Sequence, residues 1–191
     1  MNRPILTIIA GSNGCGKSTL TSSARDKFQQ YPVLDPDAIA KSIQETLGPS
    51  HSDVEAGKRV LLNADELIVA GQSFTVETTL SGNTYLKMAV RAKKAGFNIM
   101  VIFIGTASVE INIERVKARV AKGGHDVSEE DQRRRYPRTL ANMKRLLPLA
   151  DLAVILDNSS SLGHSLIATG RHGFMSWNEP TPSWALHLRE K

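Results

Sequence analysis

A glycine-rich loop near the N-terminus constrains this chain more than any other feature. Residues 11–18 read GSNGCGKS and match the pattern GxxxxGK[ST] at every fixed position. The loop follows a continuous apolar run, Ile5–Ala10, and a helical pattern begins directly after it. In a strand, loop and helix of this kind, backbone N–H groups converge on a phosphate chain at the helix N-terminus. The sequence therefore predicts a binding site for a nucleoside triphosphate, ATP or GTP.

Each part of the loop has an expected task. The glycines let the backbone curl around the phosphates. Lys17 should reach the β- and γ-phosphates, and the Ser18 hydroxyl should bind the Mg²⁺ that bridges them. We expect nucleotide contacts from Gly11, Ser12, Asn13, Gly14, Cys15, Gly16, Lys17, Ser18 and Thr19.

Cys15 is the only cysteine in the chain. One cysteine excludes an internal disulfide framework and cannot build a zinc site by itself. Within a loop rich in N–H donors its thiol pKa could be lowered, which would permit redox control. The alternative is that the loop simply needs a small residue at this position, and the sequence favours this second interpretation.

Strand and helix patterns alternate along the rest of the chain. Further apolar or β-branched runs at 33–35, 73–77, 97–104 and 152–156 predict strands. Helical patterns cover residues 18–28, 37–48, 52–71, 85–95, 108–120 and 128–147, and Pro137 should bend or split the last of them. This alternation predicts a three-layer α/β P-loop NTPase fold with a parallel core sheet.

The predicted domain organisation is simple. No linker divides the 191 residues, so we expect one P-loop kinase-like domain over residues 1–191. Residues 108–147 should form a helical lid. Residues 172–191 contain both tryptophans and should form an irregular tail packed on the body.

Apolar segments and net charge indicate where the protein is located and which kind of partner it binds. The first apolar run is too short for a signal sequence, and no stretch approaches the roughly 20 apolar residues of a membrane span. We therefore expect a cytoplasmic protein without a membrane partner. The net charge is +5, and residues 108–147 hold ten Lys or Arg against six Asp or Glu. Such a basic segment suits an anionic partner.

Carboxylates follow two of the predicted strands, where an open α/β sheet places its crevice. Phosphoryl transfer to a hydroxyl needs a group that deprotonates the acceptor, and Asp37 is the candidate, although it could equally cap the next helix. Asp35 could bind the acceptor or form a turn before Pro36. Glu77, Thr78 and Thr79 follow the third strand and should bind the acceptor. Asp157 is not assigned to metal binding, because a fifth strand should lie toward the sheet edge.

The basic segment resembles a hinged lid. Arg115 and Arg119 lie four residues apart on one predicted helix, residues 133–135 are all arginine on the next, and Gly123 with Gly124 separates the two. Closure would bring guanidinium groups onto the transferring phosphoryl group and exclude water. A nucleic-acid platform is disfavoured because only Tyr136 is interleaved with these charges.

Taken together, these motifs resemble the zeta toxin family of P-loop kinases, especially its shorter members. The resemblance rests on GSNGCGKST at 11–19, LDPDAIA at 34–40, FTVETTLSG at 74–82 and ERVKARVAKGGHDVSEEDQRRRYPR at 114–138. It implies phosphorylation of a sugar hydroxyl by ATP or GTP, with UDP-N-acetylglucosamine as acceptor, and an antitoxin partner. By the same resemblance Lys17 binds phosphate, Asp37 activates the acceptor, Glu77 binds it, and Arg119 and Arg134 stabilise the phosphoryl group.

The sequence thus favours an ATP-dependent, Mg²⁺-dependent small-molecule kinase. Two other functions stay open. One is an NTP-hydrolysing switch that acts through a protein partner, and the other is a nucleic-acid-end kinase or binder that uses the basic helices.

Overall fold

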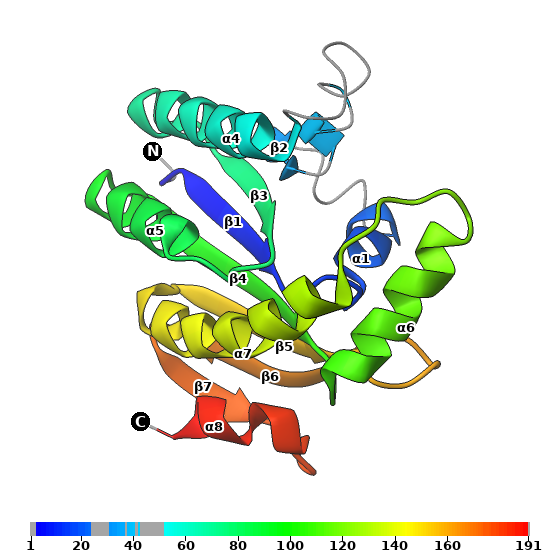
Figure 1. The fold of residues 1–191 in the computed structure, drawn as a ribbon. Helices are drawn as coiled ribbons and strands as arrows, with labels where there is room; N and C mark the ends of the chain where they lie inside the picture. Colours follow the sequence, from blue (N-terminus) through cyan, green and yellow to red (C-terminus); the bar gives the residue numbers. More distant parts are fainter. Residues whose placement is uncertain (1–2, 24–30, 37, 41, 43–51, 191) are drawn as a thin grey trace.

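A seven-stranded sheet organises the computed structural model of the chain (Figure 1), which describes residues 3–23, 31–36, 38–40, 42 and 52–190. The strand order across the sheet is β2-β3-β1-β4-β5-β6-β7. The strands are β1 (Ile5–Ala10), β2 (Val33–Leu34), β3 (Phe74–Thr78), β4 (Asn98–Gly105), β5 (Leu152–Asp157), β6 (Ser165–Arg171) and β7 (Phe174–Trp177).

The first five strands are parallel, as the sequence predicts. Strand β1 pairs with β3 on one side and β4 on the other, and β2 and β5 extend these pairs outward. Every residue of β1 from Leu6 to Ala10 except Thr7 is fully buried, because both faces of the sheet are covered. The mixed α/β fold with a parallel core is therefore confirmed.

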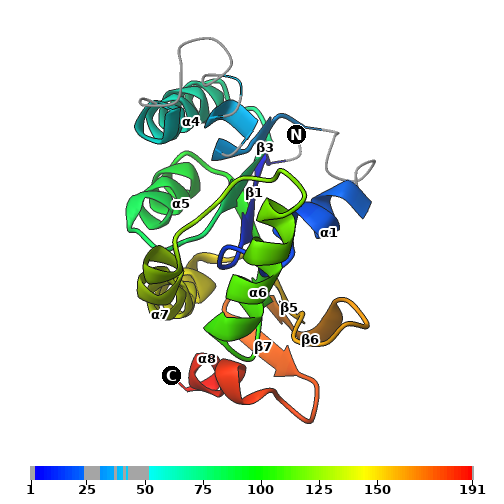
Figure 2. The ribbon, with the colours of Figure 1, turned by 45° about the vertical axis from the view of Figure 1, so that its right-hand side comes forward.

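The helices follow the predicted pattern closely. They are α1 (Lys17–Ser23), α4 (Ser52–Val69), α5 (Thr84–Lys94), α6 (Val109–Val120), α7 (Glu129–Leu146) and α8 (Leu186–Arg189), with short 3₁₀ turns η2 (Leu147–Leu149) and η3 (Ser183–Ala185). The far ends of the helices predicted over 18–28 and 37–48 lie outside the described residues. Helices α4, α5 and α7 line one face of the sheet, and α1 lies on the other (Figure 2).

Residues near the N-terminus of α7 stabilise its first turn. The Ser128 hydroxyl caps it by accepting a hydrogen bond from the backbone N–H of Asp131. Three acidic residues occupy its first turn, where the helix dipole favours negative charge. Pro137 does not split the helix, which continues unbroken to Leu146.

The C-terminal region departs from the prediction of an irregular tail over residues 172–191. Strands β6 and β7 form an antiparallel hairpin that extends the sheet beyond β5. The two residues between them, His172 and Gly173, have φ of 49° and 82°. Positive φ at both central positions is the geometry of a type I′ turn, which matches strand twist. His-Gly is not a common sequence for this turn, so the sequence pattern does not predict the hairpin.

The last residues are nevertheless packed on the body, as expected. The indole of Trp184 is 6% exposed and its ring centroid lies 6.0 Å from that of Phe103 on β4. Its Nε1 donates to a carboxylate oxygen of Asp157 at 2.7 Å. Strand β5 lies two strands from β1, toward the edge that β6 and β7 form, and its Asp157 carboxylate holds the C-terminal segment.

Within the described ranges, none of the helices has both the length and the apolar character needed to cross a membrane.

Candidate functional site

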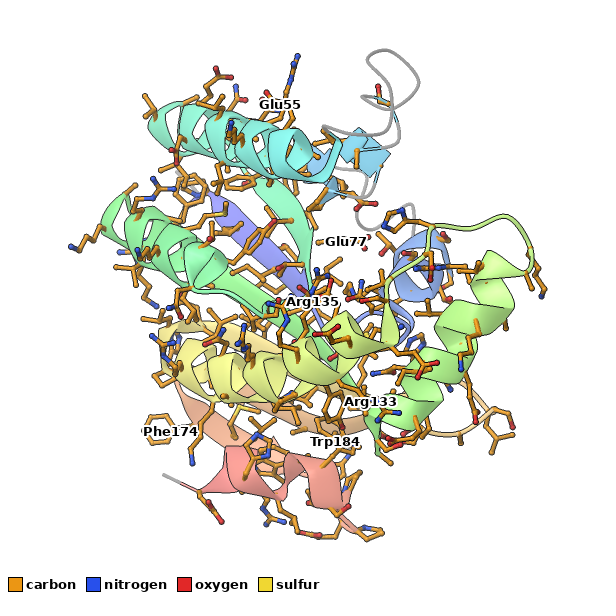
Figure 3. All side chains as sticks on the ribbon, in the orientation of Figure 1. Glu55, Glu77, Arg133, Arg135, Phe174 and Trp184 are labelled. Atoms are coloured by element: carbon orange, nitrogen blue, oxygen red, sulfur yellow. The ribbon has the colours of Figure 1, made fainter. Side chains whose placement is uncertain are left out.

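A cleft of about 850 Å³ opens where the loops after β1, β3 and β5 meet helices α6 and α7. Glu77 from β3 and Arg135 from α7 both border it (Figure 3). Its other principal walls are the phosphate loop, the segment after β2 and the connection between α6 and α7. Its polar and charged lining includes Lys17, Ser18, Thr19, Asp35, Glu77, Thr78, Thr79, Arg115, Arg119, Lys122, His125, Arg135, Asn158 and Ser160.

Two glycines of the loop are required by their surroundings. Gly14 has φ of 78°, and a Cβ there would stand 2.4 Å from the backbone oxygen of Asn112 on α6. Gly16 has φ of 103°, and a Cβ there would stand 2.4 Å from the amide nitrogen of Asn158. Both positions need the left-handed backbone and the close approach that only glycine permits. The loop is thus pressed between α6 and the segment after β5.

The ammonium group of Lys17 lies across the loop that it follows. Its Nζ donates to the backbone oxygen of Gly11 at 2.7 Å and to that of Ser12 at 3.1 Å. Lys17, Ser18 and Thr19 all border the cleft at the start of α1. A cation and a helix N-terminus therefore face the same space, which favours an anion such as a phosphate chain.

Cys15 lies inside the loop and is fully buried. Burial raises the pKa of its thiol above the usual range, although the charge of Lys17 acts in the opposite direction. The lowered pKa considered from the sequence is therefore wrong. The structure supports the alternative, a small residue that fills the interior of the loop.

The Cys15 thiol is expected to react with a disulfide reagent at pH 8 at least roughly tenfold more slowly in the folded protein than in urea, because it is protonated and covered. Release of the coloured thiolate from the reagent measures both rates. Since the folded pKa is raised, this thiol should also make folding less favourable above about pH 8.5. Equal rates in the two states would contradict this placement.

The carboxylate of Glu77 is held beside the first helix. It is 6% exposed, and one of its oxygens accepts a hydrogen bond of 2.6 Å from the Thr21 hydroxyl, one turn beyond Ser18. Strand β3 neighbours β1, so the ends of both strands meet at the cleft. Thr78 and Thr79 border it too, and Asp35 approaches from the end of β2. Asp37 lies outside the described residues.

The candidate arginines of α6 and α7 divide into two groups. Arg115, Arg119 and Arg135 border the cleft. Arg134, the candidate from the sequence, does not border it; its side chain is 52% exposed and is hydrogen-bonded to Asp131. Neighbouring positions on a helix point about 100° apart, so the sequence choice among three consecutive arginines depended on a rotation it could not supply.

Sequence reasoning missed the role of the segment after β5. The Asn158 side chain donates to the backbone oxygen of Cys15 at 2.8 Å and so ties this segment to the phosphate loop. Arg115 donates to the backbone oxygens of Asn158 at 2.7 Å and Ser160 at 3.3 Å. Because these contacts span 43 residues or more in sequence, no local pattern marks them.

The cleft is rich in positive charge. Among the residues that the structure describes, five cationic side chains border it against two carboxylates. Guanidinium groups bind phosphate oxygens through planar pairs of donors, and an ammonium binds them as a point charge. The lining therefore suits an anionic ligand with several charged oxygens. The cationic residues are Lys17, Arg115, Arg119, Lys122 and Arg135.

The oxygen donors of the cleft fit Mg²⁺. The Ser18 hydroxyl and the carboxylates of Glu77 and Asp35 are hard oxygen ligands. In the part of the chain that the structure describes, no three His, Cys, Asp or Glu residues gather into a metal-binding group. Mg²⁺ at phosphate sites is commonly held by one or two protein oxygens together with substrate phosphates, and Ser18 with one carboxylate would match this pattern.

The chain is similar to known proteins in sequence. The family model described as zeta toxin matches residues 1–162. An uncharacterized protein of Haemophilus influenzae is 40% identical over 126 residues, which are 66% of this chain and 88% of that protein.

Solved structures share the fold. The PezAT toxin–antitoxin system of Streptococcus pneumoniae contains a chain with a TM-score of 0.62 and 18% identity, covering 96% of this chain and 76% of its own. A chain of the AvrRxo1-ORF1:ORF2 structure with ATP has a TM-score of 0.65 and 15% identity, covering 95% of this chain and 64% of its own.

Proposed function

Because the chain belongs to the zeta toxin family, whose model matches residues 1–162, we propose that it is a P-loop kinase. In this proposal it transfers the γ-phosphoryl group of ATP or GTP to a hydroxyl group of a small molecule. One observation carries the proposal: the phosphate loop, three arginines and Glu77 border the same cleft. A kinase needs this combination, because its chemistry consists mainly of positioning and charge stabilisation.

The proposed reaction begins with the nucleotide on residues 11–19. The backbone N–H groups of the loop and the α1 N-terminus bind the phosphates, and Lys17 turns from the loop oxygens to the β- and γ-phosphates. Arg119 and Arg135 neutralise the charge that develops on the transferring group. Arg135 takes the task expected of Arg134, because it borders the cleft and Arg134 does not.

The acceptor lies on the side of the carboxylates. Glu77, Thr78 and Thr79 bind it with Asp35, and Asp37 accepts the proton of its hydroxyl group. The acceptor oxygen forms a bond to the γ-phosphorus while the bond from that phosphorus to the β–γ bridging oxygen breaks, and the nucleoside diphosphate leaves. Mg²⁺, which Ser18 would hold, supplies further neutralisation of phosphate charge when bound.

The proposed acceptor class is supported by the family and by the charge of the cleft. A sugar nucleotide such as UDP-N-acetylglucosamine carries both hydroxyl groups and negative charge, which suits the excess of cations. An antitoxin is the proposed protein partner, supported by the likeness to a chain of the PezAT toxin–antitoxin system.

The proposal is tested with γ-labelled ATP and a panel of sugar nucleotides, nucleosides and oligonucleotides, with products identified by mass. We expect one class of small molecule to gain a phosphate. Asp37→Asn should lower that transfer by on the order of a hundredfold while leaving the ATP affinity unchanged. Asp35→Asn is the matched comparison and should raise the acceptor KM instead.

Two outcomes would overturn the proposal. If ATP is consumed and no panel member gains a phosphate, the protein is better explained as a hydrolysing switch. If only oligonucleotides are labelled, and their binding weakens steeply with salt, it is a nucleic-acid-end kinase.

A further inference from the structure

We propose that Gly124, in the connection between α6 and α7, is a positioning residue for Arg119. This inference rests on the proposed kinase function, in which Arg119 contacts the transferring phosphoryl group. Neither the loop motif nor the charge pattern of the sequence assigns Gly124 a role beyond a break between helices. Its backbone and its missing side chain together determine where the Arg119 guanidinium lies.

The end of α6 folds back through a Schellman motif. The backbone N–H of Gly123 donates to the oxygen of Val120 at 2.8 Å, and that of Gly124 donates to the oxygen of Arg119 at 3.0 Å. Gly123 has φ of 82°, the left-handed value that this motif places just beyond a helix. The chain therefore reverses over the last turn of α6, and residues 124–127 return along the cleft.

This reversal lays Gly124 flat against the stem of Arg119. A Cβ at Gly124 would stand 2.5 Å from Cγ of Arg119, 3.0 Å from its backbone oxygen and 3.2 Å from its Cδ. The backbone oxygen is fixed by the helix, so a side chain at position 124 would have to displace the arginine stem. Only glycine allows the connection to come this close.

The same reversal provides the partner of the guanidinium group. One terminal nitrogen of Arg119 donates to the backbone oxygen of His125 at 2.7 Å. Its Nε is buried and, among the described residues, has no hydrogen-bond partner. The group is thus oriented by one backbone carbonyl that immediately follows Gly124, and Arg119 borders the cleft from this position. A shift of the connection between α6 and α7 would therefore displace both the His125 carbonyl and the Arg119 stem.

The consequence concerns the transition state rather than nucleotide binding in general. A donor stabilises developing charge only when it is aimed at the position that the charge will occupy. A displaced Arg119 should still leave the phosphate loop and Lys17 to bind ADP. The loss should therefore appear with a mimic of the transferring phosphoryl group and not with ADP alone.

The test is calorimetric binding of two probes, ADP and ADP with aluminium fluoride, each with Mg²⁺. Gly124→Ala should weaken binding of the fluoride complex by roughly tenfold and leave ADP binding unchanged, because one aimed donor is lost in part. Gly123→Asn is the matched control: a Cβ there meets nothing within 4 Å, and asparagine tolerates positive φ. It should bind both probes as the wild type does.

A double-mutant cycle separates positioning from a general structural effect. In the Arg119→Ala background Gly124→Ala should have no further effect, since it acts through the arginine. An equal loss in both backgrounds, or wild-type binding by Gly124→Ala when Arg119→Ala is defective, would overturn this inference and leave the proposed function intact. If the wild type binds neither probe, the proposed function fails, and the inference with it.

Discussion

Lys17→Ala is expected to lower phosphoryl transfer by roughly a thousandfold, about 4 kcal/mol of transition-state stabilisation, which is the upper range for a single aimed donor. The Lys17 ammonium lies over the phosphate loop within 3.1 Å of two of its backbone oxygens. Lys17 is the only cationic residue of α1 within residues 17–23, the helix that follows the phosphate loop. Transfer of label from γ-labelled ATP measures the loss.

The fold should survive this substitution. Lys17 is only partly buried, and its two hydrogen bonds go to oxygens of an accessible loop, so the melting temperature should change little. Lys58→Ala, on the exposed face of α4, is a matched control with the same change in charge and should transfer phosphate at the wild-type rate. Unchanged transfer by Lys17→Ala in a folded protein would mean that the loop does not bind the reacting phosphates.

The parts of the site that the sequence predicts are those encoded over a few residues. The spacing of Gly11, Gly16, Lys17 and Ser18 describes a local turn whose geometry depends on its own glycines, and the structure places that turn between β1 and α1. The burial of β1 also follows from its unbroken apolar run. Such features need no knowledge of distant contacts.

The parts that the sequence does not predict depend on contacts between distant elements. Which of three consecutive arginines faces the cleft is set by the rotation of α7 against its neighbours, and Arg135 faces it instead of Arg134. The contribution of Asn158 depends on hydrogen bonds to the loop 143 residues earlier. Asp37 stays a prediction from the sequence.

The hairpin of β6 and β7 is a second feature that the sequence does not predict. A hairpin is usually recognised by Asn-Gly or Asp-Gly, whereas here His172 adopts the positive φ of 49° that the turn requires. Without that hairpin, β5 looks like the sheet edge and its Asp157 looks free for loop chemistry. With it, the carboxylate becomes the partner of an indole from the last residues of the chain.

Trp184→Ala is therefore expected to lower the free energy of unfolding by about 3–5 kcal/mol, as for other large buried aromatic side chains. The indole lies directly on β4, where a Cβ at Gly105 would stand 2.2 Å from its ring. The substitution removes this contact and the packing against Phe103, and leaves an Asp157 oxygen without its indole donor. Urea unfolding followed by circular dichroism measures the change.

Two further variants divide this loss into its causes. Trp184→Phe keeps a ring on Gly105 and removes the N–H donor, so it should cost less, about 1–2 kcal/mol. Phe174→Ala removes an aromatic side chain that is 85% exposed on the neighbouring hairpin (Figure 3) and should change stability by less than about 0.5 kcal/mol. If Trp184→Ala unfolds at the same urea concentration as Phe174→Ala, the C-terminal segment contributes nothing to the core, and the sheet must be stable without it.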